Sequence, residues 1–101
     1  MIDGDTIDIE GRRIRLLGFD TPEIFSPKCS AEKIRGEAAA ERLRQLIMDG
    51  DKLLLSKQIS KDKYGRELAN FIIDDTDVSN ILIREGLARK YSGQQRLGWC
   101  S

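Results

Sequence analysis

Four acidic side chains near the start of the chain have a spacing that could build a metal-binding pocket. They are Asp3, Asp5, Asp20 and Glu23. If residues 6–18 form a β-hairpin, its two open ends place Asp5 beside Asp20. Carboxylates that lie this close repel each other unless a cation sits between them or one is protonated. The alternative interpretation is that all four are turn residues, which is the more frequent outcome for carboxylates beside glycine and proline.

Two arginines are the candidate partners for a phosphate group. Arg15 lies on the strand face opposite its apolar neighbours, and Arg66 ends a polar loop that contains Tyr64. A guanidinium presents a planar fork of donors that matches the geometry of a phosphate. The alternatives are a solvated strand arginine for Arg15 and a surface ion pair with Asp62 or Glu67 for Arg66. For either arginine taken singly, the alternative is the favoured interpretation.

The residue types that are missing narrow the chemistry further. The chain contains no histidine, which excludes a Ser-His-Asp triad, a Cys-His pair and a histidine general base. Apart from two methionines, the only soft metal ligands are Cys29 and Cys100. A metal would therefore be held by oxygen atoms, which suits calcium, magnesium or manganese. The two cysteines could form a disulfide or remain two free thiols.

The charges are distributed unevenly along a chain whose net charge is zero. Residues 1–23 hold six acids and three bases, a net charge of −3. Residues 24–66 hold ten bases and six acids, a net charge of +4, and residues 67–101 hold four bases and five acids, a net charge of −1. This distribution is compatible with ordinary surface charge and with an acidic metal pocket beside a basic face.

The length and hydropathy of the chain limit its organisation. A chain of 101 residues indicates a single domain over residues 1–101. No apolar segment approaches the length of a membrane span, so we expect no membrane association. The chain does not begin with a signal segment, and a secreted or periplasmic location is compatible with the sequence.

The pattern of apolar residues predicts short strands and helices that would carry these side chains. In chain order we predict a hairpin with a turn at 10–12, a loop at 24–35, a helix at 36–48, strands at 52–59 and 68–73 around a turn at 60–66, a short helix at 78–85 and a strand at 87–91. This order indicates a mainly β protein with helices, of the α+β class. A small five-stranded Greek-key barrel of the oligonucleotide-binding type is the leading candidate.

Three motifs in this order are far more specific than any one of them. They are Asp3-Gly4-Asp5-Thr6, Arg15-Leu16-Leu17-Gly18-Phe19-Asp20-Thr21-Pro22-Glu23 and Asp62-Lys63-Tyr64-Gly65-Arg66. Together they resemble the staphylococcal nuclease (thermonuclease) family, and the resemblance covers roughly residues 3–91. It implies an oligonucleotide-binding barrel and a calcium-dependent nuclease with little sequence specificity, which leaves 3′-phosphates on DNA or RNA. Since the family has a longer strand before the first motif, we expect a truncated first strand here.

The resemblance also assigns roles to the acidic residues at matching positions. Asp5, Asp20 and the backbone carbonyl of Thr21 would hold the calcium ion. Glu23 would be the general base or would orient the attacking water. Elementary chemistry agrees, because a carboxylate must act on the water in a chain without histidine.

The basic and aromatic residues receive roles from the same resemblance. Arg15 and Arg66 would hold the phosphate and offset the negative charge that builds up on a five-coordinate phosphorus centre. Lys63, Tyr64 and Tyr91 would border the bound nucleotide. We expect a nucleic-acid partner, with single-stranded or unwound polymer favoured.

Two other functions are compatible with the same fold. Some barrel domains of this family bind nucleic acid or a protein partner without catalysis, and others serve as structural parts of a larger assembly. All the matched acidic and arginine positions are present here, which favours the nuclease. The preference for DNA or RNA and the oligomeric state stay open.

Overall fold

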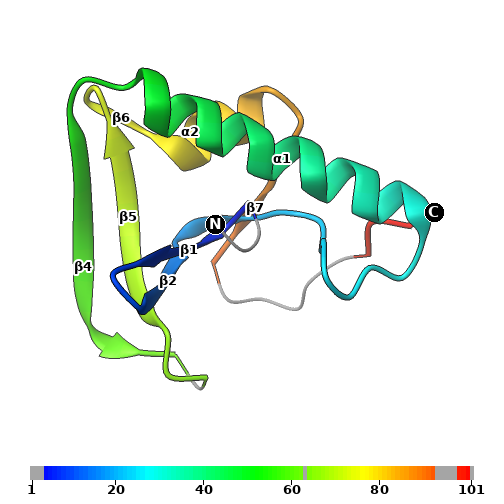
Figure 1. Cartoon of the computed structure of the whole chain (residues 1–101), viewed down its shortest axis with the longest axis horizontal. Helices are drawn as coiled ribbons and strands as arrows, with labels where there is room; N and C mark the ends of the chain where they lie inside the picture. Colours follow the sequence, from blue (N-terminus) through cyan, green and yellow to red (C-terminus); the bar gives the residue numbers. More distant parts are fainter. Residues whose placement is uncertain (1–3, 63, 93–97, 101) are drawn as a thin grey trace.

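The computed structural model describes residues 4–62, 64–92 and 98–100 of the chain. The elements follow one another as β1 Thr6–Ile9, β2 Arg12–Leu16, β3 Gly18–Asp20, α1 Ser30–Asp49, β4 Leu53–Lys61, β5 Glu67–Ile73, β6 Thr76–Asp77, α2 Val78–Arg84 and β7 Arg89–Tyr91 (Figure 1). Strands and helices are therefore mixed along the chain, and the predicted α+β class is confirmed.

The strands form two sheets. The larger has the order β1-β2-β5-β4, and β6 pairs with the end of β5. Within it β2 and β5 are parallel, whereas β1 with β2 and β4 with β5 are antiparallel. The smaller sheet is the antiparallel pair of β3 and β7. Over the described residues the large sheet does not close on itself, so the expected Greek-key barrel is open, with β1 and β4 as its edges.

The β1–β2 hairpin forms where its sequence predicts it. Its two-residue turn is Glu10-Gly11, and both residues have positive φ, 51° and 80°. Positive φ at both central positions is the turn geometry that matches the twist of paired strands, and glycine adopts it without steric cost. The register pairs Thr6 with Arg15, so the residue before β1 lies beside the end of β2.

Helix α1 begins at Ser30, six residues before the predicted start at residue 36, so the prediction of a loop over 24–35 was wrong at its end. Cys29 caps the helix, because its sulfur accepts a hydrogen bond from the Glu32 N–H at 3.4 Å. The first turns were missed because an acidic side chain, Glu32, occupies the inward face where an apolar residue was expected. The predicted end is confirmed, since the N–H of Gly50 donates to the Leu46 carbonyl at 3.0 Å.

The second half of the chain follows its prediction with small shifts. Strand β4 extends to Lys61, into the predicted turn at 60–66, and its register shifts between Lys57 and Lys61. Asp77 caps α2, because its carboxylate accepts a hydrogen bond from the Ser79 N–H at 2.9 Å. The chain bends at Leu17, between β2 and β3, and Gly18 begins β3 with a positive φ of 97°.

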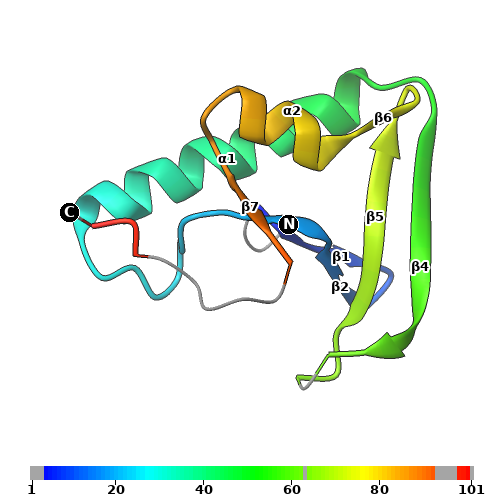
Figure 2. The same cartoon turned by 180° about the vertical axis from the view of Figure 1, so that it is seen from behind.

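Both helices pack on the large sheet and bury one continuous core. Figures 1 and 2 show α1 running along the top of the molecule, with the β1–β2 hairpin beneath it. Arg42 on α1 donates to both carboxylate oxygens of Glu85 after α2, at 2.8 and 2.9 Å. The core consists of Ile7, Ile14, Leu16, Phe19, Leu43, Ala69, Phe71, Ile73, Val78, Leu82 and Ala88. Of the helices in the described part of the chain, none combines the length and the apolar character needed to cross a membrane.

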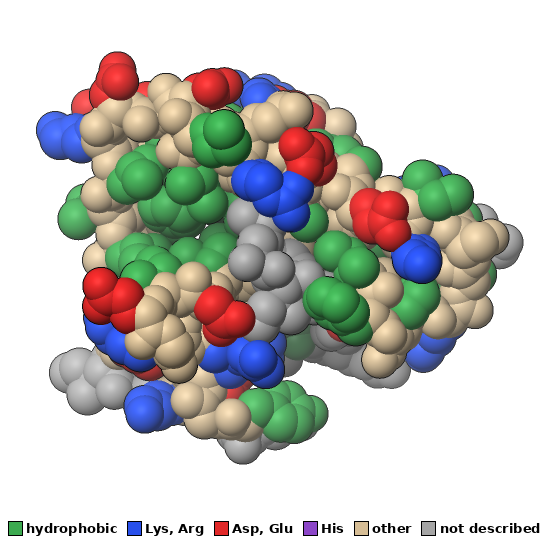
Figure 3. All heavy atoms as spheres, in the orientation of Figure 1, with side chains coloured by type: hydrophobic (Ala, Val, Ile, Leu, Met, Phe, Trp, Pro, Cys, Tyr) green, Lys and Arg blue, Asp and Glu red, His purple; other side chains and the backbone are tan. Residues whose placement is uncertain are grey.

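An apolar hollow of about 350 Å³ lies between the two edge strands. It is lined by Ile7, Asp8, Ile9, Ile47, Leu53, Leu55 and Phe71. Figure 3 shows apolar side chains gathered around it on one face of the molecule. None of the residues expected to do chemistry lines this hollow, so the candidate site lies elsewhere.

Candidate active site

The Asp5 side chain joins two segments that are far apart in sequence. Its backbone carbonyl accepts from the Leu16 N–H at 2.8 Å, which attaches it to the end of β2. One carboxylate oxygen, Oδ1, accepts from the Thr6 hydroxyl at 3.1 Å. The other, Oδ2, accepts from the Thr21 N–H at 3.3 Å. The structure therefore brings Asp5 against the peptide that links Asp20 to Thr21, as the hairpin geometry predicted.

Both candidate metal carboxylates are buried. Asp5 is 7% exposed and Asp20 3% exposed, and Thr21 is almost completely enclosed. Close packing is possible because residue 4 is glycine: a Cβ there would lie 3.0 Å from both Ala39 Cβ on α1 and Thr21 Cγ2. Burying a carboxylate is costly unless hydrogen bonds or a positive charge compensate. Asp5 meets part of this cost through the two hydrogen bonds that its carboxylate accepts.

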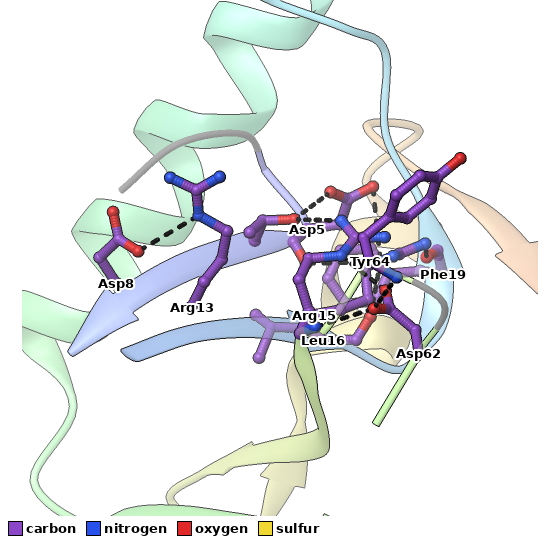
Figure 4. A network of polar contacts seen from close by, with 10 residues as sticks. Asp5, Asp8, Arg13, Arg15, Leu16, Phe19, Asp62 and Tyr64 are labelled. Atoms are coloured by element: carbon purple, nitrogen blue, oxygen red, sulfur yellow. Dashed lines mark hydrogen bonds and ion pairs between the residues drawn. The ribbon is translucent and has the colours of Figure 1, made fainter. Parts of the chain in front are cut away.

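Arg15 supplies part of that positive charge. Its side chain is 12% exposed, and Nη1 lies 3.4 Å from Asp5 Oδ2. Nη1 also donates to the Leu16 carbonyl at 2.6 Å, and Nη2 donates to the Phe19 carbonyl at 2.9 Å (Figure 4). The guanidinium lies over the ring of Tyr91, 5.8 Å from its centroid. Arg15 is thus a held, mostly buried arginine, and the interpretation as a solvated strand residue was wrong.

Arg66 reaches the same place from the β4–β5 turn. Its Nε donates to Asp62 Oδ2 at 2.6 Å, so the ion pair considered from the sequence does form. That ion pair is partly buried, and Nη1 donates further to the Thr6 hydroxyl at 3.4 Å. Thr6 in turn donates to Asp5, which links Arg66 to the acidic residues. The contact with Asp62 therefore directs Arg66 to the site.

Asp62 organises the turn that carries Arg66. Its Oδ1 accepts from the Tyr64 N–H at 3.0 Å and from the Arg66 N–H at 2.8 Å. Burial raises the pKa of Asp62, but the backbone N–H and guanidinium of Arg66 and the Tyr64 N–H lower it by more, so the net pKa lies below the usual value. The side chain is therefore ionised at neutral pH, as its role toward Arg66 requires.

Glu23 stands on the segment between β3 and α1. Its backbone N–H donates to Oε2 of Glu32 at 3.3 Å, and its side chain is half-buried. It follows Pro22, whose ring restricts the backbone just before it. The Glu23 side chain therefore projects from a backbone segment that is hydrogen-bonded to the first turn of α1.

The aromatic residues flank the two arginines. Tyr64 is 73% exposed, and the Arg66 guanidinium lies 5.6 Å from its ring centroid. Tyr91 is half-buried beside Arg15 on β7. Lys63, the other predicted nucleotide contact, lies outside the described residues, as does Asp3. Two aromatic faces thus accompany the two positive charges.

Three further residues of this network had no predicted role in the site, although Asp62 was considered as an ion-pair partner of Arg66. Thr6 connects Arg66 to Asp5, Asp62 holds Arg66, and Glu32 holds the Glu23 backbone. Thr6 and Asp62 lie inside the quoted motifs, which could have identified them. Glu32 could have been found from its place three residues after the capping Cys29, where an acidic residue commonly faces back toward the helix start.

The open question about the cysteines is resolved by a disulfide between Cys29 and Cys100, with Cα atoms 6.2 Å apart. The adjoining residues are also attached to β7. Arg89 lies 3.8 Å from the ring centroid of Trp99 and donates to the Gly98 carbonyl at 2.8 Å. The described end of the chain is thereby fixed at both the α1 cap and β7.

The donor set at the acidic end of the hairpin fits a hard cation. Within residues 4–62, 64–92 and 98–100 no group of three or more cysteine, aspartate or glutamate side chains could hold a metal ion. The site offers two buried carboxylates, of Asp5 and Asp20, with the Thr21 carbonyl in the adjoining peptide. Such oxygen donors suit hard cations, among them calcium, magnesium and manganese.

The fold is an open barrel of mixed strands and helices, and its candidate site combines buried acidic residues with two held arginines. The comparisons with known proteins name its family. Residues 13–97 match the family model described as staphylococcal nuclease homologue. The chain belongs to that family.

The curated relatives are longer than this chain. It is 40% identical over 93 residues to Endonuclease YncB of Bacillus subtilis (strain 168), an alignment that covers 87% of this chain and 44% of the relative. It is 38% identical over 93 residues to the thermonuclease of Staphylococcus intermedius, covering 88% and 55%. It is 36% identical over 107 residues to the thermonuclease of Staphylococcus hyicus, covering 96% and 63%. The chain therefore spans about half the length of these relatives.

Proposed function

We propose that this chain is a metal-dependent nuclease that hydrolyses phosphodiester bonds in DNA or RNA. The observation that carries the proposal is the convergence of two guanidiniums on one acidic segment: Arg15 contacts Asp5, and Arg66 contacts Thr6 next to it. A phosphodiester needs this combination, because its negative charge increases in the transition state. The endonuclease and thermonuclease names of the relatives support the same activity.

Calcium is the ion that we propose for the site. Asp5, Asp20 and the Thr21 carbonyl would hold it through oxygen atoms, and the bound ion would polarise the phosphate and lower the pKa of a water molecule. The support comes from the burial of both carboxylates, which a divalent cation would compensate.

The protein's own side chains account for the remaining chemistry. Arg15 and Arg66 bind the phosphate oxygens; each is held by acceptors of the protein, and a guanidinium has five donors to divide between them and a substrate. Glu23 orients the attacking water and accepts its proton. Attack of the water on phosphorus breaks the bond to the 5′ oxygen, which takes up a proton from solvent, and leaves a 3′-phosphate and a 5′-hydroxyl.

The aromatic side chains explain the preferred polymer in this proposal. The exposed ring of Tyr64 and the half-buried ring of Tyr91 border the nucleotide. Bases stack on aromatic faces regardless of their identity, which gives little sequence specificity. Stacking requires an unpaired base, so single-stranded or unwound nucleic acid is favoured.

Cleavage of single-stranded DNA, with calcium or with a chelator, tests this function. Wild type should cleave with calcium and lose the activity with the chelator, and the products should carry 3′-phosphates. Glu23→Gln preserves the shape and removes the base, so kcat should fall by at least about 10²-fold. Glu37→Gln, which removes an exposed carboxylate from α1, is the matched control and should keep wild-type turnover.

Two outcomes would contradict the proposal. Full turnover in Glu23→Gln would mean that another group activates the water. Gel retardation of DNA without cleavage, whatever divalent ion is added, would indicate a binding module in place of an enzyme.

A further inference from the structure

Glu32 is an acidic residue buried in the first turn of a helix whose other early residues face solvent. It is only 5% exposed. Its Oε2 accepts from the backbone N–H of Glu23 at 3.3 Å, and its Oε1 accepts from the backbone N–H of Lys28 at 2.7 Å. One carboxylate therefore binds the backbone at both ends of the segment 23–28 and attaches that segment to α1. A carboxylate this deeply buried is tolerated because it is hydrogen-bonded, and here backbone donors meet both of its oxygens.

A second contact lies one helical turn further along α1. Gly36 follows Glu32 by four residues, so both lie on the same helix face. A Cβ at Gly36 would lie 2.7 Å from the Pro22 carbonyl oxygen and 3.1 Å from the Glu23 carbonyl oxygen. Helix α1 therefore contacts the backbone of residues 22–23 at two places. Glu32 accepts a hydrogen bond from it, and Gly36 packs directly against it because glycine has no side chain.

The end of this segment that leads into α1 is also held at Cys29, by contacts that do not involve the Glu32 carboxylate. Cys29 is joined to Cys100 by the disulfide, and its sulfur accepts from the Glu32 backbone N–H. Loss of the Glu32 carboxylate would thus leave the start of α1 capped while removing the acceptor of the Glu23 N–H.

We propose that Glu32 is a positioning residue for Glu23. By accepting from the Glu23 N–H, it fixes the point from which the Glu23 side chain leaves the backbone. Its own oxygens are engaged by backbone donors, so it acts through Glu23 and does not touch the substrate. This inference rests on the role of Glu23 in the proposed function, where a displacement of about 1 Å can cost about 10²-fold in rate.

A double-mutant cycle tests the proposal in the full chain. The single variants are Glu32→Ala, Glu32→Gln and Glu23→Gln. Two double variants combine Glu23→Gln with each Glu32 substitution, and Glu37→Gln is the control for loss of a charge on α1. At saturating calcium and DNA, Glu32→Ala should lower kcat by about 10²-fold in the wild-type background. In the Glu23→Gln background it should lower kcat by no more than about twofold, because the group it positions is already absent.

The conservative variant adds a second criterion. Glu32→Gln keeps the volume and one acceptor oxygen, so it should retain the fold and lose less activity than Glu32→Ala. Midpoints of urea unfolding identify any variant that fails to fold, in which case the cycle is run with Glu32→Gln. Equal fold-losses in both backgrounds would show a merely structural role and would overturn the proposal.

Amide hydrogen exchange followed by NMR tests the contact without any activity. The amides of Glu23 and Lys28 should both exchange faster in Glu32→Ala. At least one of them should do so in Glu32→Gln and neither in Glu37→Gln, while amides in the β4–β5 pair keep their protection. Unchanged exchange at Glu23 would overturn the proposal. If wild type cleaves no DNA under any condition, the proposed function fails, and the exchange data decide separately whether Glu32 holds the Glu23 backbone.

Discussion

Arg15 and Arg66 are each held by two kinds of partner. Each has an acidic partner, Asp5 for Arg15 and Asp62 for Arg66, and each has a neutral oxygen acceptor beside the site. Surface ion pairs gain little, because solvent screens them and both side chains lose freedom. The partly buried contacts here restrict both guanidiniums, which is the preorganisation that the proposed electrostatic catalysis requires.

Arg15→Lys should therefore abolish most activity although it keeps the charge. A lysine has a compact ammonium that cannot meet Asp5 and the Phe19 carbonyl in the same planar arrangement. We expect kcat on single-stranded DNA to fall by about 10²-fold or more, the usual cost of losing one electrostatic donor. Arg13→Lys is the matched control, because Arg13 is exposed and pairs with Asp8 at 3.6 Å on the surface. Near wild-type turnover in Arg15→Lys would show that the fork geometry is not used.

At the scale of elements, the site depends on strands that meet at one end of the large sheet. Strand β2 carries Arg15, and the turn before β5 carries Arg66, so the parallel pairing of β2 with β5 sets the distance between them. Arg12 and Glu67 lock the start of this pairing through two hydrogen bonds, 2.7 and 2.5 Å long. The hydrogen bonds and charge of Arg12, with a smaller contribution from Lys57, lower the pKa of Glu67 from 4.5 to about 2.

This pKa predicts how stability depends on pH. The unfolded chain binds a proton at Glu67 near pH 4.5, whereas the folded chain resists protonation until about pH 2. The contribution of Glu67 is thus complete above pH 4.5 and is lost as the pH falls through this window. Arg12→Gln should make the free energy of unfolding, measured with urea at a series of pH values, fall less steeply between pH 4.5 and 2. The same slope in both proteins would mean that Arg12 does not stabilise the ionised Glu67.

The whole molecule combines an open barrel with a disulfide that attaches the end of the chain to the start of α1. Strands β1 and β4 are the sheet edges, and an apolar hollow lies between them, so the core is less enclosed on that side. On the side of the site, the Cys29–Cys100 disulfide joins residues separated by 71 positions. A cross-link over so long a loop restricts the unfolded chain strongly. The contact of Arg89 with Trp99 holds the same end of the chain without a covalent bond.

Breaking the disulfide should therefore cost considerable stability. In the chain-entropy model a loop of this length corresponds to about 4 kcal/mol. The test is urea unfolding of wild type with and without a reductant, beside the double variant Cys29→Ser and Cys100→Ser. Serine keeps a capping oxygen at the start of α1, so this variant isolates the cross-link. The reductant should leave the double variant unaffected, and a loss below about 1 kcal/mol in wild type would show that other contacts hold the chain end.

The sequence by itself determined the features that depend on neighbouring residues. The Glu10-Gly11 turn, the Asp77 cap and the end of α1 at Gly50 follow from the conformations that these residues prefer within a few positions. The alternation of apolar residues placed the strands of both hairpins, and the mixed α+β class followed from their order. The three motifs identified the family, because their joint spacing is rare by chance.

Only the tertiary structure decided the features that depend on distant contacts. The start of α1 was missed because Glu32 is a charged residue on the buried face of the helix. Its burial depends on hydrogen bonds from the backbone of the preceding loop, and the hydropathy of neighbouring residues does not predict such bonds. The disulfide required the separation between Cys29 and Cys100, and the open sheet required the pairing of every strand. Arg15 and Arg66 had two interpretations each until the contacts with Asp5 and Thr6 were known. A charged side chain looks the same in sequence whether it faces water or a site, and only the groups folded around it decide which.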